Sequence, residues 1–387
     1  MKKILIITNY GLGGVSSMLE LFKECLKRNN VKFDICYYEP YSVNKNLSVP
    51  ILNFFFKKPK YKIIKQKYFK EIKIGCVLPE LEYKNHTGDA WKEIVSKYDK
   101  ILNVSGTLTN SFEAVNLKKN IIQWVATPVL DDREFRIASK NFLRQLFDNI
   151  FVKSKMFEIE KLVLNYENQK IFVLSDYTKK FFKKNLPLKN IDKLKYGIDT
   201  KKFFNIKNKK DKKRFTIGFI GRVDDPRKNV QLLIEIYTKI EKIIPNVKLK
   251  IIGGKKNFDY EIDQNRILYK QFITDKKLLR EYYSSIDIFL VCSYQEGLCI
   301  SALEAMACGS VVLSTPCKGT KEFIVNGKNG YYLSFNSDDF VKKIVQLNKN
   351  KKKLKKMSKN SIRTIKNNYS KDIFIKSFNS QVQKYIS

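Results

Sequence analysis

A repeated alternation of short buried strands and amphipathic helices constrains this chain more than any other feature. The N-terminal run KKILIITNY is typical of a buried strand, and the Gly-rich GLGG after it leads into an amphipathic helix, VSSMLELFKECLKRN. Further strands are expected at 31–39, 100–106 and 121–128. Another is expected from residue 170, where Ser175 can cap the next helix. Such alternation predicts parallel βαβ units with helices on both faces of a sheet.

The alternation is interrupted once and then restarts. Residues 195–214 are polar and Lys-rich, which is typical of a linker. Strand and helix patterns return in FTIGFIGR, VQLLIEIYTKIEKII, VKLKIIGG, LLREYYSSI, DIFLVCS, SALEAMACG, VVLST and GYYLS. We therefore expect an α/β protein of two doubly wound, Rossmann-like domains, 1–200 and 201–367, facing a central cleft. A final helix, 368–387, is expected to pack back on the first domain. Ligands of such sheets bind beyond the carboxyl ends of the strands.

The charge of the chain narrows the class of partner. Lys and Arg outnumber Asp and Glu by 75 to 38, giving a formal net charge of +37 over 387 residues. This charge favours nucleic acid, an anionic membrane or an anionic small substrate. The cations are nearly all Lys, whereas nucleic-acid readers rely on Arg for bidentate contacts. Abundant Lys, Asn and Ile fit an AT-rich genome. We therefore expect an anionic partner other than nucleic acid.

Cysteine and histidine usage excludes several site chemistries. The seven cysteines are Cys25, Cys36, Cys76, Cys292, Cys299, Cys308 and Cys317. Their number is odd and no CxxC occurs, so we expect free thiols in a reducing cytoplasm. The single histidine, His86, is expected in a surface loop and cannot build a zinc site with scattered cysteines. Apolar runs reach about ten residues, half the length of a membrane span, and the N-terminal run is interpreted as a first strand rather than a signal peptide.

Residues 294–309, YQEGLCISALEAMACG, hold two carboxylates, Glu296 and Glu304, on either side of a helix start near Ile300. The first amides of a helix are unpaired and lie at the positive end of its dipole, which suits a diphosphate. Eight residues of helix span about 12 Å. Glu296 can therefore accept sugar hydroxyls, and Glu304 the ribose hydroxyls, of one nucleotide-diphosphate sugar. The alternative is that Glu304 faces solvent. The residues expected around the diphosphate are Gly297, Leu298, Cys299 and Ile300.

Two cations follow a buried strand in GFIGRVDDPRKNV. Gly221 ends this strand, and Arg222 and Lys228 come after its carboxyl end. Each cation can neutralise a leaving diphosphate as charge develops on it, although either alone could be a solvated surface charge. The aspartate pairs at 131–132 and 224–225 lack the Asp-x-Asp spacing of a metal site. We therefore expect no metal.

The stretch at 294–309 closely resembles the E-x7-E signature of the retaining family-4 glycosyltransferases, which have the GT-B fold. GFIGRVDDPRKNVQLLIEIY resembles the family's strand with its Gly-Arg and downstream Lys. LKIIGG, DIFLVCSYQEG and GTKEFIVNGKNGYYL resemble the segments that follow. NYGLGGVSSML, LSDYTKKFF and KYGIDTKKF are similar to its Gly-Gly loop, Ser-capped helix and interdomain segment. The resemblance, strongest over 170–335, implies that Arg222 and Lys228 hold the donor diphosphate.

The resemblance also implies roles for the two domains, with the first binding the acceptor and the second the nucleotide-sugar donor. Gly13 and Gly14 match the Gly-Gly loop, expected near the acceptor or a phosphate. Family members often carry a histidine where this chain has Ala126. Thr127 or a backbone carbonyl would then take over its contact with the sugar. Asp131, followed by Asp132 and Arg133, is a candidate for acceptor contact.

The activity implied is that of a retaining glycosyltransferase of bacterial surface polysaccharide, lipopolysaccharide or capsule synthesis. It would move a sugar from a UDP- or GDP-linked donor to a glycan or lipid-linked acceptor, without cofactor or metal. The resemblance implies front-face displacement, with the leaving phosphate taking the acceptor proton and Glu296 positioning the sugar. A sugar-nucleotide epimerase or a phosphorylase of the same fold is an alternative, and so is a nucleic-acid-binding protein. The last would show steeply salt-dependent binding.

Residues 53–73, NFFFKKPKYKIIKQKYFKEIK, form the densest basic and aromatic stretch. Read as a helix, it places Tyr61, Ile64, Tyr68 and Ile72 on one face and lysines on the rest, a pattern typical of interfacial helices on anionic lipid. The alternative is a helix packed on the first domain with a solvated Lys face. A lipid-linked acceptor favours the first reading. We therefore expect a cytoplasmic protein, peripheral on the inner face of the membrane.

Overall fold

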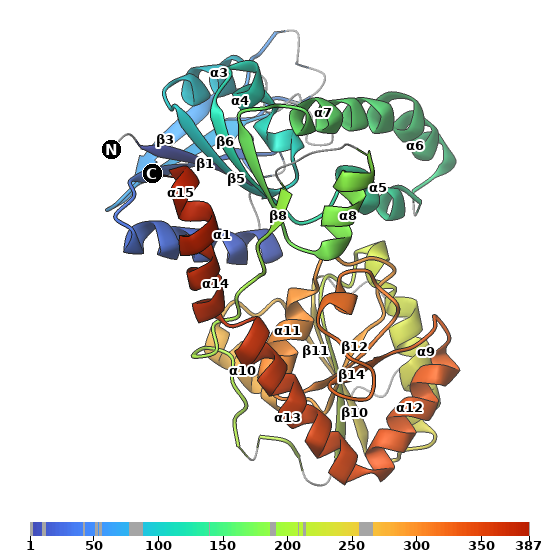
Figure 1. The fold of residues 1–387 in the computed structure, drawn as a ribbon. Coiled ribbons are helices and arrows are strands. Elements are labelled where there is room, and N and C mark those ends of the chain that lie inside the picture. Colours follow the sequence, from blue (N-terminus) through green and yellow to red (C-terminus); the bar gives the residue numbers. More distant parts are fainter. Residues whose placement is uncertain are drawn as a thin grey trace. The chain divides into compact units, whose positions relative to one another are not determined.

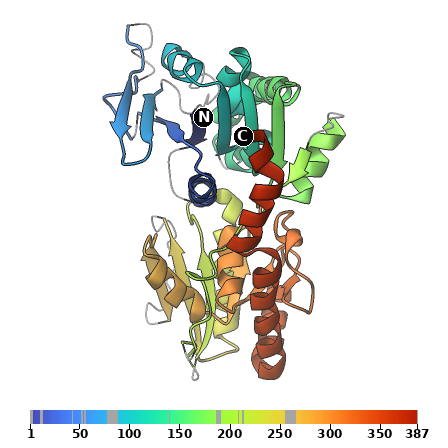
Figure 2. The same ribbon diagram turned by 60° about the vertical axis from the view of Figure 1, so that its left-hand side comes forward.

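The chain forms two compact units in a computed structural model (Figures 1 and 2). The structure describes residues 3–9, 13–41, 43–50, 53, 56–76, 88–138, 140–185, 191–207, 209–211, 214–254 and 266–386. The first unit comprises Met1–Lys195 with Ile375–Ser387, and the second comprises Tyr196–Phe374. His86, expected in a surface loop, lies outside the described residues.

The first unit is built on an eight-stranded sheet. Its strands are β1 (Ile4–Asn9), β2 (Phe33–Glu39), β3 (Tyr61–Lys65), β4 (Lys70–Gly75), β5 (Lys100–Gly106), β6 (Asn120–Val125), β7 (Gln169–Val173) and β8 (Ile191–Lys193). They lie in the order β3-β4-β2-β1-β5-β6-β7-β8, and every pairing is parallel except that of β3 with β4. The strand order reverses between β1 and β5, which makes that point the topological switch of a doubly wound sheet.

Helices cover both faces of this sheet. They are α1 (Gly14–Arg28), α3 (Asp89–Ser96), α4 (Phe112–Asn116), α5 (Val129–Ala138), α6 (Phe142–Phe147), α7 (Ser154–Leu164) and α8 (Asp176–Asn185), followed at the C-terminus by α15 (Gln383–Ile386). Of α14 (Lys371–Ser377), the residues from Ile375 on belong to this unit. Side chains of α3 and α7 share one core cluster with Leu5 and Ile7 of β1. The C-terminal segment packs on α1, where the rings of Phe22 and Phe378 lie 5.6 Å apart.

The helix expected over 53–73 is not formed in its described part, and this prediction is wrong. β3 and β4 instead form an antiparallel hairpin at the sheet edge, with Ile63 opposite Ile72 (Figure 2). Ile72 and Ile74, two residues apart, are both buried. Only the two-residue period of a strand places both on the core face. β4 also continues the sheet through parallel pairing with β2, which satisfies its backbone groups on both edges.

The second unit has a six-stranded parallel sheet. Its strands are β9 (Phe215–Ile220), β10 (Val247–Gly253), β11 (Ile267–Gln271), β12 (Ile288–Val291), β13 (Val311–Ser314) and β14 (Gly330–Tyr332), in the order β11-β10-β9-β12-β13-β14. Counted along the unit, this is the 3-2-1-4-5-6 order of a Rossmann fold. Its switch point lies between β9 and β12.

The helices of the second unit are α9 (Val230–Glu241), α10 (Lys276–Ser284), α11 (Ile300–Ala307), α12 (Ser337–Lys349) and α13 (Lys351–Asn368). Figure 1 shows α9 and α12 on one side of the strands and α10 and α11 on the other. The segment expected as a linker packs on this unit, with Phe203 and Tyr283 ring centroids 6.0 Å apart.

Several local predictions are confirmed. Ser175 caps α8, because its Oγ accepts from the amide of Thr178 at 3.2 Å. The helix expected near Ile300 begins at that residue. All seven cysteines are buried free thiols. Over the described residues, no helix has the length and apolar character needed to cross a membrane.

Candidate functional site

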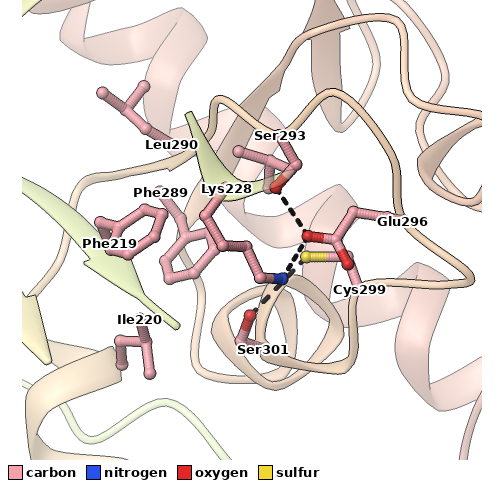
Figure 3. Close-up of a pocket in the computed structure, with 10 residues that line it drawn as sticks. Phe219, Ile220, Lys228, Phe289, Leu290, Ser293, Glu296, Cys299 and Ser301 are labelled. Atoms are coloured by element: carbon pink, nitrogen blue, oxygen red, sulfur yellow. Dashed lines mark hydrogen bonds and ion pairs between the residues drawn. The ribbon is translucent and has the colours of Figure 1, made fainter. Parts of the chain in front are cut away.

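A small pocket lies at the switch point of the second sheet (Figure 3). Phe219 and Ile220 line it from the end of β9, and Phe289, Leu290 and Val291 from β12. Lys228, Ser293, Glu296, Cys299 and Ser301 supply its polar side. The free space in it, open solvent included, is about 180 Å³, so the pocket itself is much smaller than the roughly 300–1,000 Å³ of a usual ligand site. It lies at the position where the sheet of a Rossmann fold binds its ligand.

An ion pair between Lys228 and Glu296 fills the polar side of this pocket (Figure 3). Lys228 Nζ lies 2.5 Å from Glu296 Oε1, which also accepts from Ser293 Oγ at 2.7 Å. Burial alone would raise the pKa of the Glu296 carboxyl, but the Lys228 ammonium outweighs burial and holds that pKa below its usual value. Burial likewise lowers the pKa of Lys228, and Glu296 more than offsets this, so the net shift is upward. Both groups are therefore charged at neutral pH.

The helix start expected to bind an anion borders the same pocket. Cys299 precedes α11 with φ +63°, in the left-handed region that side chains other than glycine rarely adopt. Asn229 precedes α9 with φ +47°. Strained residues of this kind persist where the surrounding structure holds them, and they gather at functional sites. Burial raises the pKa of the Cys299 thiol to about 12, so the thiol stays protonated. Leu298 is buried and Ile300 is the first residue of α11.

Arg222 does not line this pocket. Its guanidinium lies 2.8 Å from Asp225 Oδ2, and its side chain is 50% exposed. The Asp225 carboxylate also accepts two hydrogen bonds from the guanidinium of Arg227, at 2.9 and 2.6 Å. Arg227 is the more buried of the two cations, and it interacts electrostatically with Glu296. The loop after β9 thus carries three cations, of which Lys228 and Arg227 face Glu296.

Glu304 is buried inside the second unit rather than on a solvent face. Its Oε2 accepts from the hydroxyl of Tyr283 at 2.8 Å, and burial raises the pKa of its carboxyl. The alternative of a solvated Glu304 is therefore wrong. The hydrogen bond from the neutral Tyr283 hydroxyl orients this carboxylate.

Glycines bring backbone close to the charged residues. A Cβ on Gly221 would lie 3.7 Å from Cε of Lys228. A Cβ on Gly319 would lie 2.5 Å from the carbonyl oxygens of Glu296 and Gly297, and the Gly319 amide donates to the former at 3.1 Å. The loop that carries Glu296 therefore rests on the backbone of Gly319.

The first unit has a second switch point, between β1 and β5. Gly13 there has φ +119° and leads into α1 at Gly14. A Cβ on Gly106, at the end of β5, would lie 3.2 Å from Val15 and 3.6 Å from Ala126. Gly106 thus lies next to both Val15, which follows the Gly-Gly loop, and Ala126, where the resemblance places the family's histidine.

Asp131 is held on α5 by a hydrogen bond from the Tyr177 hydroxyl. The Val129 amide, the first of α5, donates a hydrogen bond to Oε1 of Glu160 at 3.0 Å. Burial raises the pKa of Glu160 to about 7. Arg133 instead forms an ion pair with the buried Asp148, so it is committed to holding helices together. The side chain of Asp132 lies outside the described residues.

Sequence reasoning missed Arg227 and Ser293. Ser293 stands just past the end of β12 in the S-x-x-E-G segment, so a signal for it was present. Arg227 is adjacent to Lys228 in a chain rich in cations, and its burial and its contact with Asp225 become visible only in the structure. Within the described residues, no cluster of three His, Cys, Asp or Glu side chains is arranged to hold a metal ion. The cations are the groups placed to hold an anionic ligand.

Comparisons with known proteins find similarity to glycosyltransferases. Residues 200–364 match the family model described as glycosyl transferases group 1. The chain is 26% identical over 201 residues to a lipopolysaccharide 1,2-N-acetylglucosaminetransferase of Salmonella typhimurium, which covers 45% of this chain and 52% of that protein. It is 24% identical over 339 residues to an N,N'-diacetylbacillosaminyl-diphospho-undecaprenol alpha-1,3-N-acetylgalactosaminyltransferase of Campylobacter jejuni, covering 77% of this chain and 88% of that protein.

A solved structure shares the fold over nearly the whole chain. The sucrose-phosphate synthase of Thermosynechococcus elongatus has a TM-score of 0.77 at 15% identity, covering 99% of both chains. At this identity the likeness shows a common architecture of two Rossmann-like α/β domains with parallel sheets. The chain spans about half the length of the Salmonella relative.

Proposed function

We propose that the chain, whose residues 200–364 match the glycosyl transferases group 1 family model and whose two Rossmann-like domains have the architecture of a GT-B fold, is a retaining glycosyltransferase of family-4 type. It transfers a sugar from a UDP- or GDP-linked donor to a glycan or lipid-linked acceptor. The curated relatives include enzymes named for lipopolysaccharide, capsular polysaccharide and undecaprenol-linked substrates. The product is accordingly proposed to be a bacterial surface polysaccharide.

The observation that carries this proposal is the charged switch point of the second unit. Lys228 and Glu296 lie 2.5 Å apart in a pocket at the mouth of α11. The ammonium has three N–H groups, and the bond to Glu296 uses one of them. A remaining N–H can donate to a diphosphate while the carboxylate accepts hydroxyls of the donor sugar. A pocket without charged side chains would form weaker hydrogen bonds with the diphosphate.

The proposed chemistry is a front-face displacement at the anomeric carbon of the donor sugar. The bond from the anomeric carbon to the donor phosphate breaks as the bond to the acceptor oxygen forms on the same face. The acceptor proton passes to the leaving phosphate oxygen. Lys228, Arg222 and the first amides of α11 stabilise the charge on that phosphate. Glu296 positions the sugar, and Glu304 holds the ribose.

The first unit is proposed to bind the acceptor. Gly13, Gly14, Thr127 and Asp131 surround or follow the carboxyl ends of β1 and β6, where a doubly wound sheet binds its ligand. Because a lipid-linked acceptor resides in a bilayer, we include in this proposal a peripheral location on the anionic, cytoplasmic face of the membrane.

Thermal unfolding with nucleotides tests the donor site. The full chain is melted with UDP, GDP, ADP and CMP, in the wild type and in Arg222→Ala. A ligand at about 100 times its dissociation constant stabilises the folded state by roughly 2.7 kcal/mol, which is a shift of several degrees. Arg214→Ala is the matched control, because Arg214 also pairs with an aspartate three residues away and is 55% exposed.

We expect one nucleoside diphosphate to shift the wild type and the control but to shift Arg222→Ala less. The absence of a shift with every nucleotide would overturn the donor site. An equal shift in all three proteins would remove Arg222 from it. The anomeric configuration of the product, read by NMR with the nucleotide sugar so identified, then decides between retention and inversion.

A further inference from the structure

A run of exposed apolar side chains lies on one helical segment of the first unit. α6, the π-helical turns Asp148–Lys153 and α7 follow one another without a break. In Figure 1, α7 lies beside the sheet of this unit and α6 extends past it. The exposed residues are Phe142, Leu143, Leu146, Phe147, Ile150 and Phe151, with Phe142 at 74% and Leu143 at 73% exposure.

These residues form a continuous stripe. They occur as three adjacent pairs, each four residues after the last, so they share one side of the helix. The rings of Phe147 and Phe151 touch, with centroids 5.4 Å apart. A single exposed Leu needs no explanation, whereas a contiguous apolar patch on a folded surface marks an interaction site.

The opposite side of the segment is anchored in the unit. Val152 and Met156 are buried in its core cluster, and the carboxylate of Asp148 pairs with Arg133. The exposed stripe is therefore held outward by the packing behind it. Its residues do not belong to a loosely attached end.

The charges beside the stripe are positive. Residues 140–158 hold four cations, Lys140, Arg144, Lys153 and Lys155, against two carboxylates: Asp148, which Arg133 neutralises, and Glu158, which lies 3.6 Å from Lys155. Arg144 stands over the ring of Phe147 at 5.5 Å. A second copy of this chain would meet the stripe with the same positive charge, in a protein of net charge +37. An anionic surface complements both properties of the stripe.

We propose that this stripe docks the protein on an anionic lipid bilayer, with its Phe and Leu side chains inserted among the lipids and the cations against the headgroups. The inference deepens the proposed function, on which it rests for its purpose, since a lipid-linked acceptor lies in that bilayer. The stripe is near the candidate acceptor residue Asp131 in the chain, because Asp131 lies on α5, the helix that precedes α6. Glu160 of α7 accepts a hydrogen bond from the Val129 amide at the start of α5, which ties α5 to the same helical segment.

Co-sedimentation with vesicles tests the docking surface. The full chain is mixed with vesicles of phosphatidylcholine alone or with about one third phosphatidylglycerol. The variant Leu143→Glu/Phe147→Glu/Phe151→Glu alters three side chains that face solvent, so its melting temperature should stay near that of the wild type. Ile243→Glu/Val325→Glu, two exposed apolar residues of the second unit, is the matched control. Ile63→Glu/Tyr68→Glu tests the basic hairpin.

We expect the wild type and the control to bind the anionic vesicles. The triple variant should lose about a thousandfold or more in partitioning, since each of the three inserted side chains contributes at least about tenfold. Lys140→Gln/Lys153→Gln/Lys155→Gln should lose the preference for phosphatidylglycerol. The proposal would be overturned if the triple variant bound the vesicles as well as the wild type, or if only the hairpin variant lost binding. It would also be overturned if the wild type were a dimer and the triple variant were a monomer.

Nucleotide binding separates this outcome from failure of the proposed function. If a nucleoside diphosphate stabilises both wild type and triple variant but neither binds vesicles, the docking surface is wrong and the donor site stands. If the vesicles bind and no nucleotide does, the docking surface stands and the proposed function fails.

Discussion

Replacing Lys228 with methionine should destabilise the second unit by more than the loss of one surface contact. The ammonium and the Glu296 carboxylate lie 2.5 Å apart, and their side chains are only 16% and 11% exposed. Methionine fills similar space but leaves Glu296 charged, with Ser293 as its other hydrogen-bond partner. Removing one member of a buried ion pair costs about 3–5 kcal/mol. We expect a loss of that size at pH 7.

The matched control is Lys239→Met in the same unit. Lys239 Nζ lies 2.6 Å from Asp338 Oδ1, but both side chains are largely exposed, and such pairs contribute less than about 1 kcal/mol. The double variant Lys228→Met/Glu296→Gln removes both charges and should recover much of the loss. A double-mutant cycle then gives a coupling of at least about 2 kcal/mol.

The assay must report on the second unit. Both tryptophans, Trp91 and Trp124, lie in the first unit, so urea unfolding is followed by circular dichroism. Acid supplies a second readout. Lys228 holds the pKa of Glu296 low in the wild type, so the pair stabilises above the unfolded pKa and its contribution is lost as pH falls through the folded pKa.

Lys228→Met removes the cation that lowers the pKa of Glu296 most and leaves the weaker influence of Arg227, so burial raises that pKa. The variant therefore regains stability on acidification as that carboxylate protonates, and its difference from the wild type should shrink toward pH 4. A loss below about 1 kcal/mol at pH 7, or one that does not change with pH, would refute a buried and charged pair.

Two further predictions concern residues that support the candidate sites. Gly319→Ala places a Cβ against the backbone of Glu296 and Gly297. We expect sugar transfer to slow by roughly 10- to 100-fold, with a loss of about 1–3 kcal/mol in the free energy of unfolding. An unchanged kcat with the nucleotide sugar identified above would contradict this. Glu160 has a pKa of about 7 in the folded protein against 4.5 for the free side chain. The first unit should therefore lose stability as the pH rises from about 4.5 to 7, by on the order of 3 kcal/mol at pH 8. Glu160→Gln keeps an acceptor for the Val129 amide and should remove this loss in melts followed by tryptophan fluorescence; the same pH dependence of stability in wild type and variant would contradict the prediction.

The second unit was the more predictable half of the fold because its strands are short apolar runs separated by clear turns. β9, β10, β12 and α11 fall where the sequence predicts them. β11 was missed, since its run ILYKQ is half polar and half buried. The 53–73 stretch was misread because its aromatic and aliphatic spacing fits a helix as well as a strand. Only pairing with β2 decides between them.

The helical segment from α6 to α7 escaped prediction for a related reason. Val152, Met156 and Ile159 face the core, while Phe147 and Phe151 face solvent. Apolar residues on both sides erase the helical period that separates a buried face from an exposed one. Such a segment carries no amphipathic signal, and its outward stripe becomes visible only when the core is placed.

The sequence predicted Lys228 and Glu296 as site residues but not that they pair with each other. Lys228 and Glu296 are 68 residues apart, and they meet because the strand order places β9 beside β12. That order is the general one of Rossmann sheets, so the meeting follows from topology. Arg222, by contrast, pairs with Asp225, a local contact between two side chains in one loop that the topology does not specify.

The two switch points show what topology leaves to the side chains. Both units order their strands alike, so each sheet offers a ligand the same kind of position. In the second unit, Lys228 and Glu296 bring full charges to it. In the first, Asn9 and Asn110 bond to each other, and Asn9 bonds to the Ser105 carbonyl at 3.0 Å. Neutral amides recognise hydroxyls and carbonyls rather than a diphosphate, so side-chain chemistry separates two sites that the backbone makes alike.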